Sequence, residues 1–295
     1  MTSIKKLEDL WMMNAAGMVK KLEDVRALVR APLSHIVVGS ITIEPRAGNP
    51  EPTFWPSPDG RWALNSRGLP GPGCKYYEQH GRAMAKMAYD ENKKLVASIT
   101  AMDSLDEWKR LACTASLFAD VVEVNASCPN KWKDGKNAGL LADDPETLIP
   151  ILGDIRSHVG WHIAIWLKLP PYRRPRTSDT LKTILSMIGN SGLVDAIVSC
   201  NTIGGQKPPI IDGKPVISMP TAGMSGARIK SWSLLQNRVI GEIAPHIPRI
   251  GVGGIRSGPD VEQYRLAGVS GVAIGTEFFK TMDPRIFSDV LAEIA

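Results

Sequence analysis

Short apolar segments recur along the chain, and each ends in small or polar residues. Eight of them have the length of a β-strand, and stretches with helical periodicity, such as residues 22–29 and 105–119, lie between them. The predicted strands are residues 10–14, 35–38, 95–99, 121–124, 163–167, 196–199, 249–252 and 271–274. Parallel strands that are buried on both faces read as continuous apolar runs, so eight β-then-α units predict an α/β protein with a (β/α)8 TIM barrel. A doubly wound open sheet is the alternative interpretation.

Two long stretches rich in proline and glycine, residues 44–76 and 204–226, interrupt this alternation. Both begin where a predicted strand ends, so we expect them to fold over the mouth of the active site, together with residues 127–139. The chain shows no linker and no internal repeat beyond the βα alternation. Since α/β barrels of about 250 residues form one domain, we predict a single domain over residues 1–295.

The composition is that of a globular protein, with 43% hydrophobic and 22% charged residues. The formal charge of +5 is dispersed over short patches such as Lys20-Lys21, Lys93-Lys94 and Arg173-Arg174. Without a long basic run, this distribution argues against a nucleic acid partner and suits an anionic small molecule or a phosphate.

The four cysteines lie far apart, and no N-terminal apolar stretch resembles a signal peptide. These features predict a reduced, cytoplasmic protein. The longest apolar runs fall far short of the roughly 20 residues that cross a bilayer, so no membrane insertion is expected. The five histidines have no metal-ligand spacing and no GxSxG is present, which excludes a metal site and serine hydrolase chemistry.

Paired glycines follow the last two predicted strands. Gly253 and Gly254 stand at the end of one strand, and Gly275 and Thr276 at the end of the next. Glycines let backbone N–H groups approach an anion, and barrels commonly bind phosphate after their seventh and eighth strands. Either motif alone suits a plain βα turn; two adjacent motifs favour a phosphate site. The chain has no GxGxxG near its N-terminus, so a mononucleotide is the better candidate.

Asparagines gather at the ends of the other strands. The stretch NASCPN, residues 125–130, directly follows a strand and contains Asn125 and Asn130. Asn65 lies on the first long loop, and Asn201 follows the strand 196–199. Each carboxamide is both a donor and an acceptor, so such a set could recognise the C=O and N–H groups of a pyrimidine-like ring.

Two further side chains at these strand ends have a possible chemical role. Lys168 could place a positive charge beside a group that becomes anionic on reduction, or it could be a salt-bridged lysine at the barrel rim. Cys128 lies near Lys131, Lys133 and Lys136, which could favour its thiolate form; the alternative is a small buried thiol. Buried core positions are predicted for the other cysteines, which are Cys74, Cys113 and Cys200.

Taken together, the motifs NASCPN, WLKLPPY, SCNTIGG, GVGGIRSG and AIGTEFF, with IEPRAGNPEP and NSRGLPG before them, resemble the dihydroorotate dehydrogenase family. The resemblance runs over essentially the whole chain and is strongest to the soluble class 1A branch. It implies a homodimeric barrel that binds FMN and oxidises dihydroorotate to orotate in pyrimidine synthesis. Fumarate is the usual electron acceptor of that branch.

The resemblance also implies roles for single residues. Cys128 is the implied general base that removes a proton from C5 while hydride passes from C6 to flavin N5, with Lys168 beside flavin N1 and O2. Residues 127–139 are the implied lid over the reacting carbon. The implied substrate contacts are Asn65, Arg67, Gly68, Leu69, Asn125, Asn130, Asn201 and Thr202. The implied FMN contacts are Ala15, Ala16, Gly17, Ser40, Asn125, Lys168, Gly226, Gly253, Gly254, Gly275 and Thr276.

The chain departs from the family pattern at three positions. The family has a lysine just before Ser40, where this chain has Gly39, and it usually has a methionine and an asparagine where Arg67 and Gly71 stand. One hypothesis is that Arg67 replaces the missing lysine as the partner of a substrate carboxylate. The other is an altered substrate, such as another pyrimidine, an enoate or a dihydrouridine in RNA, or a weakened or silent flavin-binding protein.

Overall fold

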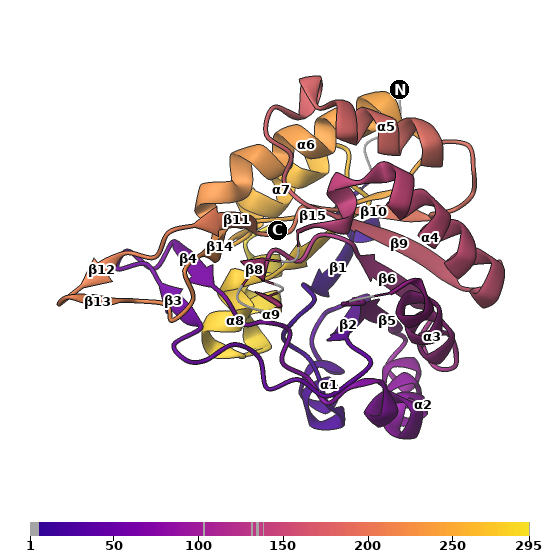
Figure 1. The fold of residues 1–295 in the computed structure, drawn as a ribbon, viewed down its shortest axis with the longest axis horizontal. Helices are drawn as coiled ribbons and strands as arrows, with labels where there is room; N and C mark the ends of the chain where they lie inside the picture. Colours follow the sequence, from indigo (N-terminus) through magenta and orange to yellow (C-terminus); the bar gives the residue numbers. More distant parts are fainter. Residues whose placement is uncertain (1–5, 103, 131, 134–135, 138, 295) are drawn as a thin grey trace.

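The computed structural model describes residues 6–102, 104–130, 132–133, 136–137 and 139–294, and its centre is a closed barrel of eight parallel strands (Figure 1). Around the barrel the strands are hydrogen-bonded in the order β1-β16-β15-β10-β9-β6-β5-β2. They are β1 (Trp11–Asn14), β2 (His35–Ile41), β5 (Lys94–Ile99), β6 (Val121–Asn125), β9 (Ala164–Leu169), β10 (Ala196–Ser199), β15 (Arg249–Val252) and β16 (Gly271–Ile274). Every predicted strand is present, so the (β/α)8 TIM barrel is confirmed and the open sheet is wrong.

Helices surround the barrel, and their sequences explain where several of them start. Ser104 accepts a hydrogen bond from the backbone of Glu107, and Ser178 from that of Leu181. Such N-caps satisfy backbone donors that the helix itself leaves unpaired. The helices are α1 (Leu22–Leu28), α2 (Cys74–Asp90), α3 (Leu105–Ser116), α4 (Pro145–Val159), α5 (Asp179–Ile188), α6 (Lys230–Ile243), α7 (Gly258–Leu266), α8 (Thr276–Thr281) and α9 (Arg285–Ala292), with short 3-10 turns at Leu7–Asp9, Leu141–Asp143, Pro175–Thr177 and Ala227–Ile229. Within the described part of the chain, no helix has the length and apolar character needed to cross a membrane.

A seam between β1 and β2 closes the barrel, and side chains complete it. Only Met13 and His35 pair there as ladder residues. Beside them, the buried Asn14 carboxamide donates to the carbonyl of Val37 at 2.7 Å and accepts from its N–H at 2.9 Å. The Ser34 hydroxyl likewise accepts from the Met12 N–H and donates to its carbonyl. Asn14 therefore fixes the start of the loop that carries Ala15, Ala16 and Gly17.

The two proline- and glycine-rich stretches contain short strands that the sequence did not predict. Residues 44–76 supply β3 (Phe54–Pro56) and β4 (Trp62–Asn65). The stretch 204–226 begins within β11 (Ile203–Gln206) and ends with β14 (Ala222–Gly226). These strands form one sheet in the order β11-β14-β4-β3, with Gly223 opposite Asn65. The hairpin of β12 (Ile210–Ile211) and β13 (Lys214–Pro215) projects from it at the left of Figure 1. The strands have two to five residues, too few for a clear alternation.

The predicted lid, residues 127–139, lies partly outside the described residues. Its described part includes an antiparallel pair, β7 (Trp132–Lys133) and β8 (Lys136–Asn137). Residues 131, 134, 135 and 138 are among those outside, so a closing movement of this segment stays a prediction.

Three rings fill the amino-terminal end of the barrel interior. Trp11 and Trp166 stack with their ring centroids 6.0 Å apart, and His35 lies 5.3 Å from each. Burial lowers the pKa of His35 to about 4, so its ring is neutral at neutral pH. These rings close the barrel at the end opposite to the carboxyl ends of the strands.

Replacing Asn14 with leucine should open the seam. The change keeps the side-chain volume but leaves the N–H and the carbonyl of Val37 buried without partners, which should lower the free energy of unfolding by about 2–5 kcal/mol. Urea denaturation of the Asn14→Leu protein measures this loss. The exposed Asn190→Leu is the control and should change stability by less than about 0.5 kcal/mol; equal effects of the two substitutions would contradict this account of the seam.

Candidate active site

A single cavity gathers every residue that the sequence nominated for a site. It opens at the carboxyl ends of the barrel strands, and its empty space, counted together with the open mouth, is about 1070 Å³. The nominated residues that line it are Ala15, Ala16, Gly17, Ser40, Asn65, Arg67, Gly68, Leu69, Asn125, Cys128, Asn130, Lys168, Asn201, Thr202, Gly226, Gly253, Gly254, Gly275 and Thr276. The fold brings them together; their individual roles stay predictions.

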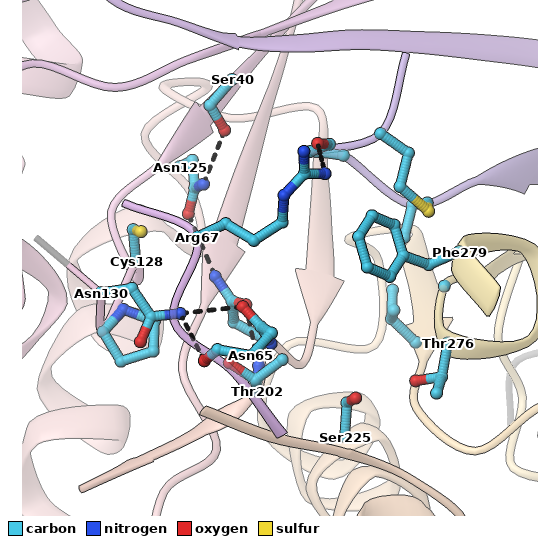
Figure 2. Close-up of a pocket in the computed structure, with 18 of the residues that line it drawn as sticks. Ser40, Asn65, Arg67, Asn125, Cys128, Asn130, Thr202, Ser225, Thr276 and Phe279 are labelled. Carbon is cyan, nitrogen blue, oxygen red and sulfur yellow. Dashed lines mark hydrogen bonds between the residues drawn. The ribbon is translucent and has the colours of Figure 1, made fainter. Parts of the chain in front are cut away.

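The four predicted asparagines form two hydrogen-bonded pairs on one wall of this cavity (Figure 2). Asn130 donates to the side-chain oxygen of Asn65 at 2.9 Å, and Asn201 donates to that of Asn125 at 3.3 Å. Asn125 in turn donates to the Ser40 hydroxyl at 2.9 Å. These bonds hold the carboxamides in place before a ligand arrives, which lowers the entropic cost of recognising a planar ring.

The Thr202 hydroxyl is a polar group that the protein itself leaves unsatisfied. Its oxygen is buried and has no hydrogen-bond partner among the described residues, although Thr202 lines the cavity. A buried hydroxyl without a partner costs free energy unless a ligand pairs with it. Gly223 allows this arrangement, because a Cβ there would lie 2.3 Å from the Thr202 oxygen.

Cys128 lies on the same wall as the asparagines, with 8% of its surface exposed. The turn before it is held by Asn201, which donates to the Ser127 carbonyl and hydroxyl at 3.0 Å each. Cys128 thus belongs to the cavity lining and not to the hydrophobic core cluster of the barrel. The side chains of Lys131, Lys133 and Lys136 lie outside the described residues.

The sequence left two roles open for Lys168, a cation in the site or a salt-bridged lysine, and its surroundings have features of both. It lines the cavity, and its ammonium group lies 3.9 Å from Oε1 of Glu123, a buried glutamate on β6. That oxygen has no hydrogen bond among the described residues. The pair therefore keeps the lysine charge balanced inside the barrel without a direct hydrogen bond.

At the opposite end of the cavity the predicted phosphate loops meet. The backbone N–H groups of Gly254, Gly275 and Thr276 donate to no acceptor among the described residues, and all three residues line the cavity. The N-terminus of α7, which follows the first of these loops, is already capped: Gly258 donates to Glu293, and the backbone of Arg256 to Asp260. The helix that begins at the cavity is α8, with Thr276.

Several cavity residues were not predicted. Phe54 and Phe279 pack at 4.4 Å in an edge-to-face arrangement, and the Arg67 guanidinium lies 4.7 Å above the Phe279 ring. Arg67 also donates to the Gly17 carbonyl at 3.5 Å. Lys20 is a third cation in the lining. In the sequence it was part of a dispersed basic patch, and nothing there showed that its side chain turns inward.

The remaining cysteines only partly follow the prediction. Cys74 is buried as expected, whereas Cys113 on α3 is partly exposed. Cys200 is buried, and this burial raises the pKa of its thiol to about 12, although the residue also contributes to the cavity wall. A thiol with so high a pKa stays protonated at neutral pH, so Cys128 is the better candidate for a base.

Comparisons with known proteins agree with this geometry. The family model described as dihydroorotate dehydrogenase matches residues 8–295. The "Dihydroorotate dehydrogenase B (NAD(+)), catalytic subunit" of Anoxybacillus flavithermus is 30% identical and covers 89% of this chain and 78% of its own length. The protein of the same name from Methanocaldococcus jannaschii is 28% identical over 92% of this chain and 83% of its own.

A solved structure supports the fold. The crystal structure of DHODH from Eimeria tenella in complex with ferulenol superposes with a TM-score of 0.78, at 20% identity, over 96% of this chain and 80% of that one. Because the family model spans the barrel and both ends of its cavity, the chain belongs to the dihydroorotate dehydrogenase family of oxidoreductases.

Proposed function

We propose that this protein oxidises dihydroorotate to orotate with FMN as its cofactor, in pyrimidine synthesis. The observation that carries the proposal is that one cavity joins the backbone N–H groups of Gly254, Gly275 and Thr276, which have no acceptor among the described residues, to a wall of paired carboxamides with Cys128 and Lys168. A mononucleotide with a planar ring system fits such a cavity, with its phosphate at the glycines.

The residues present fit FMN. The unpaired N–H groups of Gly254, Gly275 and Thr276 suit a phosphate, and Ala15, Ala16 and Gly17 leave room for a ring beside β1. Gly254 cannot carry a larger residue, since a Cβ there would lie 2.9 Å from the Gly226 carbonyl. When bound, FMN supplies the acceptor for a hydride.

The chain's own residues account for the other half of the chemistry. The asparagine pairs and the Thr202 hydroxyl hold the pyrimidine ring through its amide groups. Cys128, as thiolate, takes the proton from C5, while the hydride leaves from C6. Lys168 keeps a positive charge close to the site, offset by Glu123 at 3.9 Å, where negative charge develops on reduction.

The electron acceptor and the assembly are parts of the same proposal. The relatives described above are named for NAD(+) and as catalytic subunits, whereas the class 1A resemblance favours fumarate and a homodimer. Anaerobic reduction followed by reoxidation with fumarate, NAD and a quinone in turn distinguishes these acceptors.

Bleaching of the flavin band by dihydroorotate tests the activity itself. Bound FMN that does not bleach would show that the protein is a silent flavin binder or acts on another substrate.

Cys128→Ala should slow flavin reduction by dihydroorotate by about 10²- to 10⁴-fold, because the proton at C5 loses its acceptor. Stopped-flow absorbance measures this rate, and orotate binding should persist. Cys113→Ala, on the outer helix α3, is the control and should react at the wild-type rate. A Cys128→Ala protein that is reduced at an unchanged rate would rule out the thiolate base.

Gly254→Ala should lower both stability and FMN retention. The new Cβ would meet the Lys230 Cβ at 2.8 Å and the Gly226 carbonyl at 2.9 Å, at a φ of +71°. We expect a loss of about 2–4 kcal/mol in unfolding free energy and most of the FMN. Gly213→Ala has a similar φ of +73° with nothing within 4 Å, so it should lose only about 1 kcal/mol. Equal losses would show that the close contact at Gly254 does not matter.

Arg67→Met tests whether the Arg67 guanidinium contacts FMN or the substrate carboxylate. Because the group lies over Phe279 and beside Gly17, we expect the substitution to weaken FMN retention by about tenfold, the effect of one charged contact, and to leave orotate affinity nearly unchanged. Fluorescence titration measures FMN affinity, and calorimetry measures orotate affinity. The opposite result, a selective loss of orotate affinity, would support Arg67 as the replacement for the family lysine.

A further inference from the structure

The cavity has an excess of positive charge. Lys20, Arg67 and Lys168 belong to its described lining, and no described lining residue carries a carboxylate. Lys168 is balanced by Glu123, and Arg67 contacts Phe279 and Gly17. The ammonium group of Lys20 forms no ion pair with a carboxylate among the described residues, although the backbone N–H of this residue contacts Asp24. Its ammonium group makes one contact, with the Ser40 carbonyl at 3.4 Å.

The backbone holds Lys20 firmly in position. Val19 pairs with Val38 as a short extension beside β2. The N–H of Lys20 donates to the Asp24 carboxylate at 2.7 Å, and its carbonyl accepts from the hydroxyl of the buried Tyr77 at 2.8 Å. Because both backbone groups of Lys20 are bonded, the direction of its side chain is set by the fold.

The side chain of Lys20 runs past Gly71 to the end of β2. A Cβ built on Gly71 would lie 4.0 Å from the Lys20 Cδ and 3.9 Å from the Ser40 carbonyl, which is ordinary contact. Any longer side chain at position 71 would enter the space that Lys20 occupies. Gly71 therefore keeps a path open for the lysine.

Position 39, next to the carbonyl that Lys20 contacts, cannot supply a cation. A Cβ built on Gly39 would lie 2.3 Å from the Ser98 carbonyl and 2.8 Å from the Ile41 nitrogen, at a φ of +102°. Both atoms belong to the backbone of the barrel and cannot move aside cheaply. A positive charge at this corner must come from another segment, and Lys20 reaches it from the loop after β1.

We propose that Lys20 binds the carboxylate of the substrate, in the corner formed by Ser40, Gly71 and the cavity face of Cys128. This inference deepens the function proposed above and rests on it. A carboxylate is the group of dihydroorotate that a lysine without an anionic partner recognises best, while the carboxamides hold its ring amides.

The amine of Lys20 changes its charge near neutral pH, so a bound carboxylate can shift its protonation. Burial, together with the charges of Arg67 and Lys168, lowers the pKa of Lys20 to about 7, although Cys128 and Asp24 act in the opposite direction. A bound carboxylate favours the protonated amine, so binding takes up a proton wherever Lys20 is neutral beforehand. Orotate affinity should be greatest below pH 7 and should fall about tenfold per pH unit above it.

The test is calorimetric titration of the FMN-loaded protein with orotate and with its neutral amide, orotamide, from about pH 6 to about pH 8.5. Lys20→Met should weaken orotate binding at pH 6 by roughly 10- to 100-fold, the usual effect of losing a charged hydrogen bond. Orotamide binding should stay unchanged, and the pH dependence should disappear. Lys20→Arg should keep orotate affinity at low pH and remove its fall above pH 7, since a guanidinium does not titrate there.

Two pairs of variants separate this role from a structural one. Lys21→Met removes the neighbouring exposed lysine, whose ammonium group lies 3.9 Å from Glu23, and should leave both affinities unchanged. Gly71→Asn should displace Lys20 and reproduce the effect of Lys20→Met on orotate alone, whereas Gly71→Ala should bind orotate like the wild type.

The outcomes distinguish this inference from the proposed function. Orotate affinity that is independent of Lys20 and of pH would overturn the role of Lys20 and leave the dihydroorotate reaction intact. A parallel loss of orotate and orotamide affinity in Lys20→Met would also overturn it, because the lysine would then support the cavity rather than the carboxylate. A wild-type protein that binds FMN but neither ligand would refute the proposed function and this inference together.

Discussion

Two hydrogen bonds between the Asn14 carboxamide and the backbone of Val37 close the barrel at its weakest ladder. Only one residue pair, Met13 with His35, joins β1 and β2 as strands, so side chains must satisfy the neighbouring backbone groups. Closure places the carboxyl ends of all eight strands around one opening of the barrel. The aromatic side chains of Trp11 and Trp166 pack at the other end. The cavity exists because one end of the barrel is filled and the other is not.

The described lining of this cavity carries an excess of positive charge. The lining brings three cations together without a carboxylate, and only Glu123, one layer deeper, offsets Lys168. Positive groups that are partly removed from water favour an anionic ligand over a neutral one. In the proposed complex a phosphate at the glycines and a carboxylate at Lys20 would occupy opposite ends of the same space, and the paired asparagines would contact the neutral amides of the substrate.

Glycines allow the close approaches on which both ends depend. At Gly254 a side chain would collide with the Gly226 carbonyl, and at Gly39 with the Ser98 carbonyl. The second collision concerns the position where the family has a lysine. The backbone of this chain leaves no room for a side chain at position 39, and the amine of Lys20, from a different loop, lies beside the same strand end.

The barrel, the four asparagines, Cys128, Lys168 and the paired glycines were readable from the chain alone, because apolar strand runs and the polar residues directly after them are local signals. Other cavity residues, such as Ser40, Arg67 and Thr202, were nominated only by the family resemblance. Short strands such as β4 and β14 were not, since they exist only by pairing across 158 residues, as between Asn65 and Gly223. Lys20 was likewise invisible as a cavity residue: a lysine in a basic pair gives no indication of direction. Its inward course depends on Asp24, Tyr77 and the open space at Gly71, which only folding brings together.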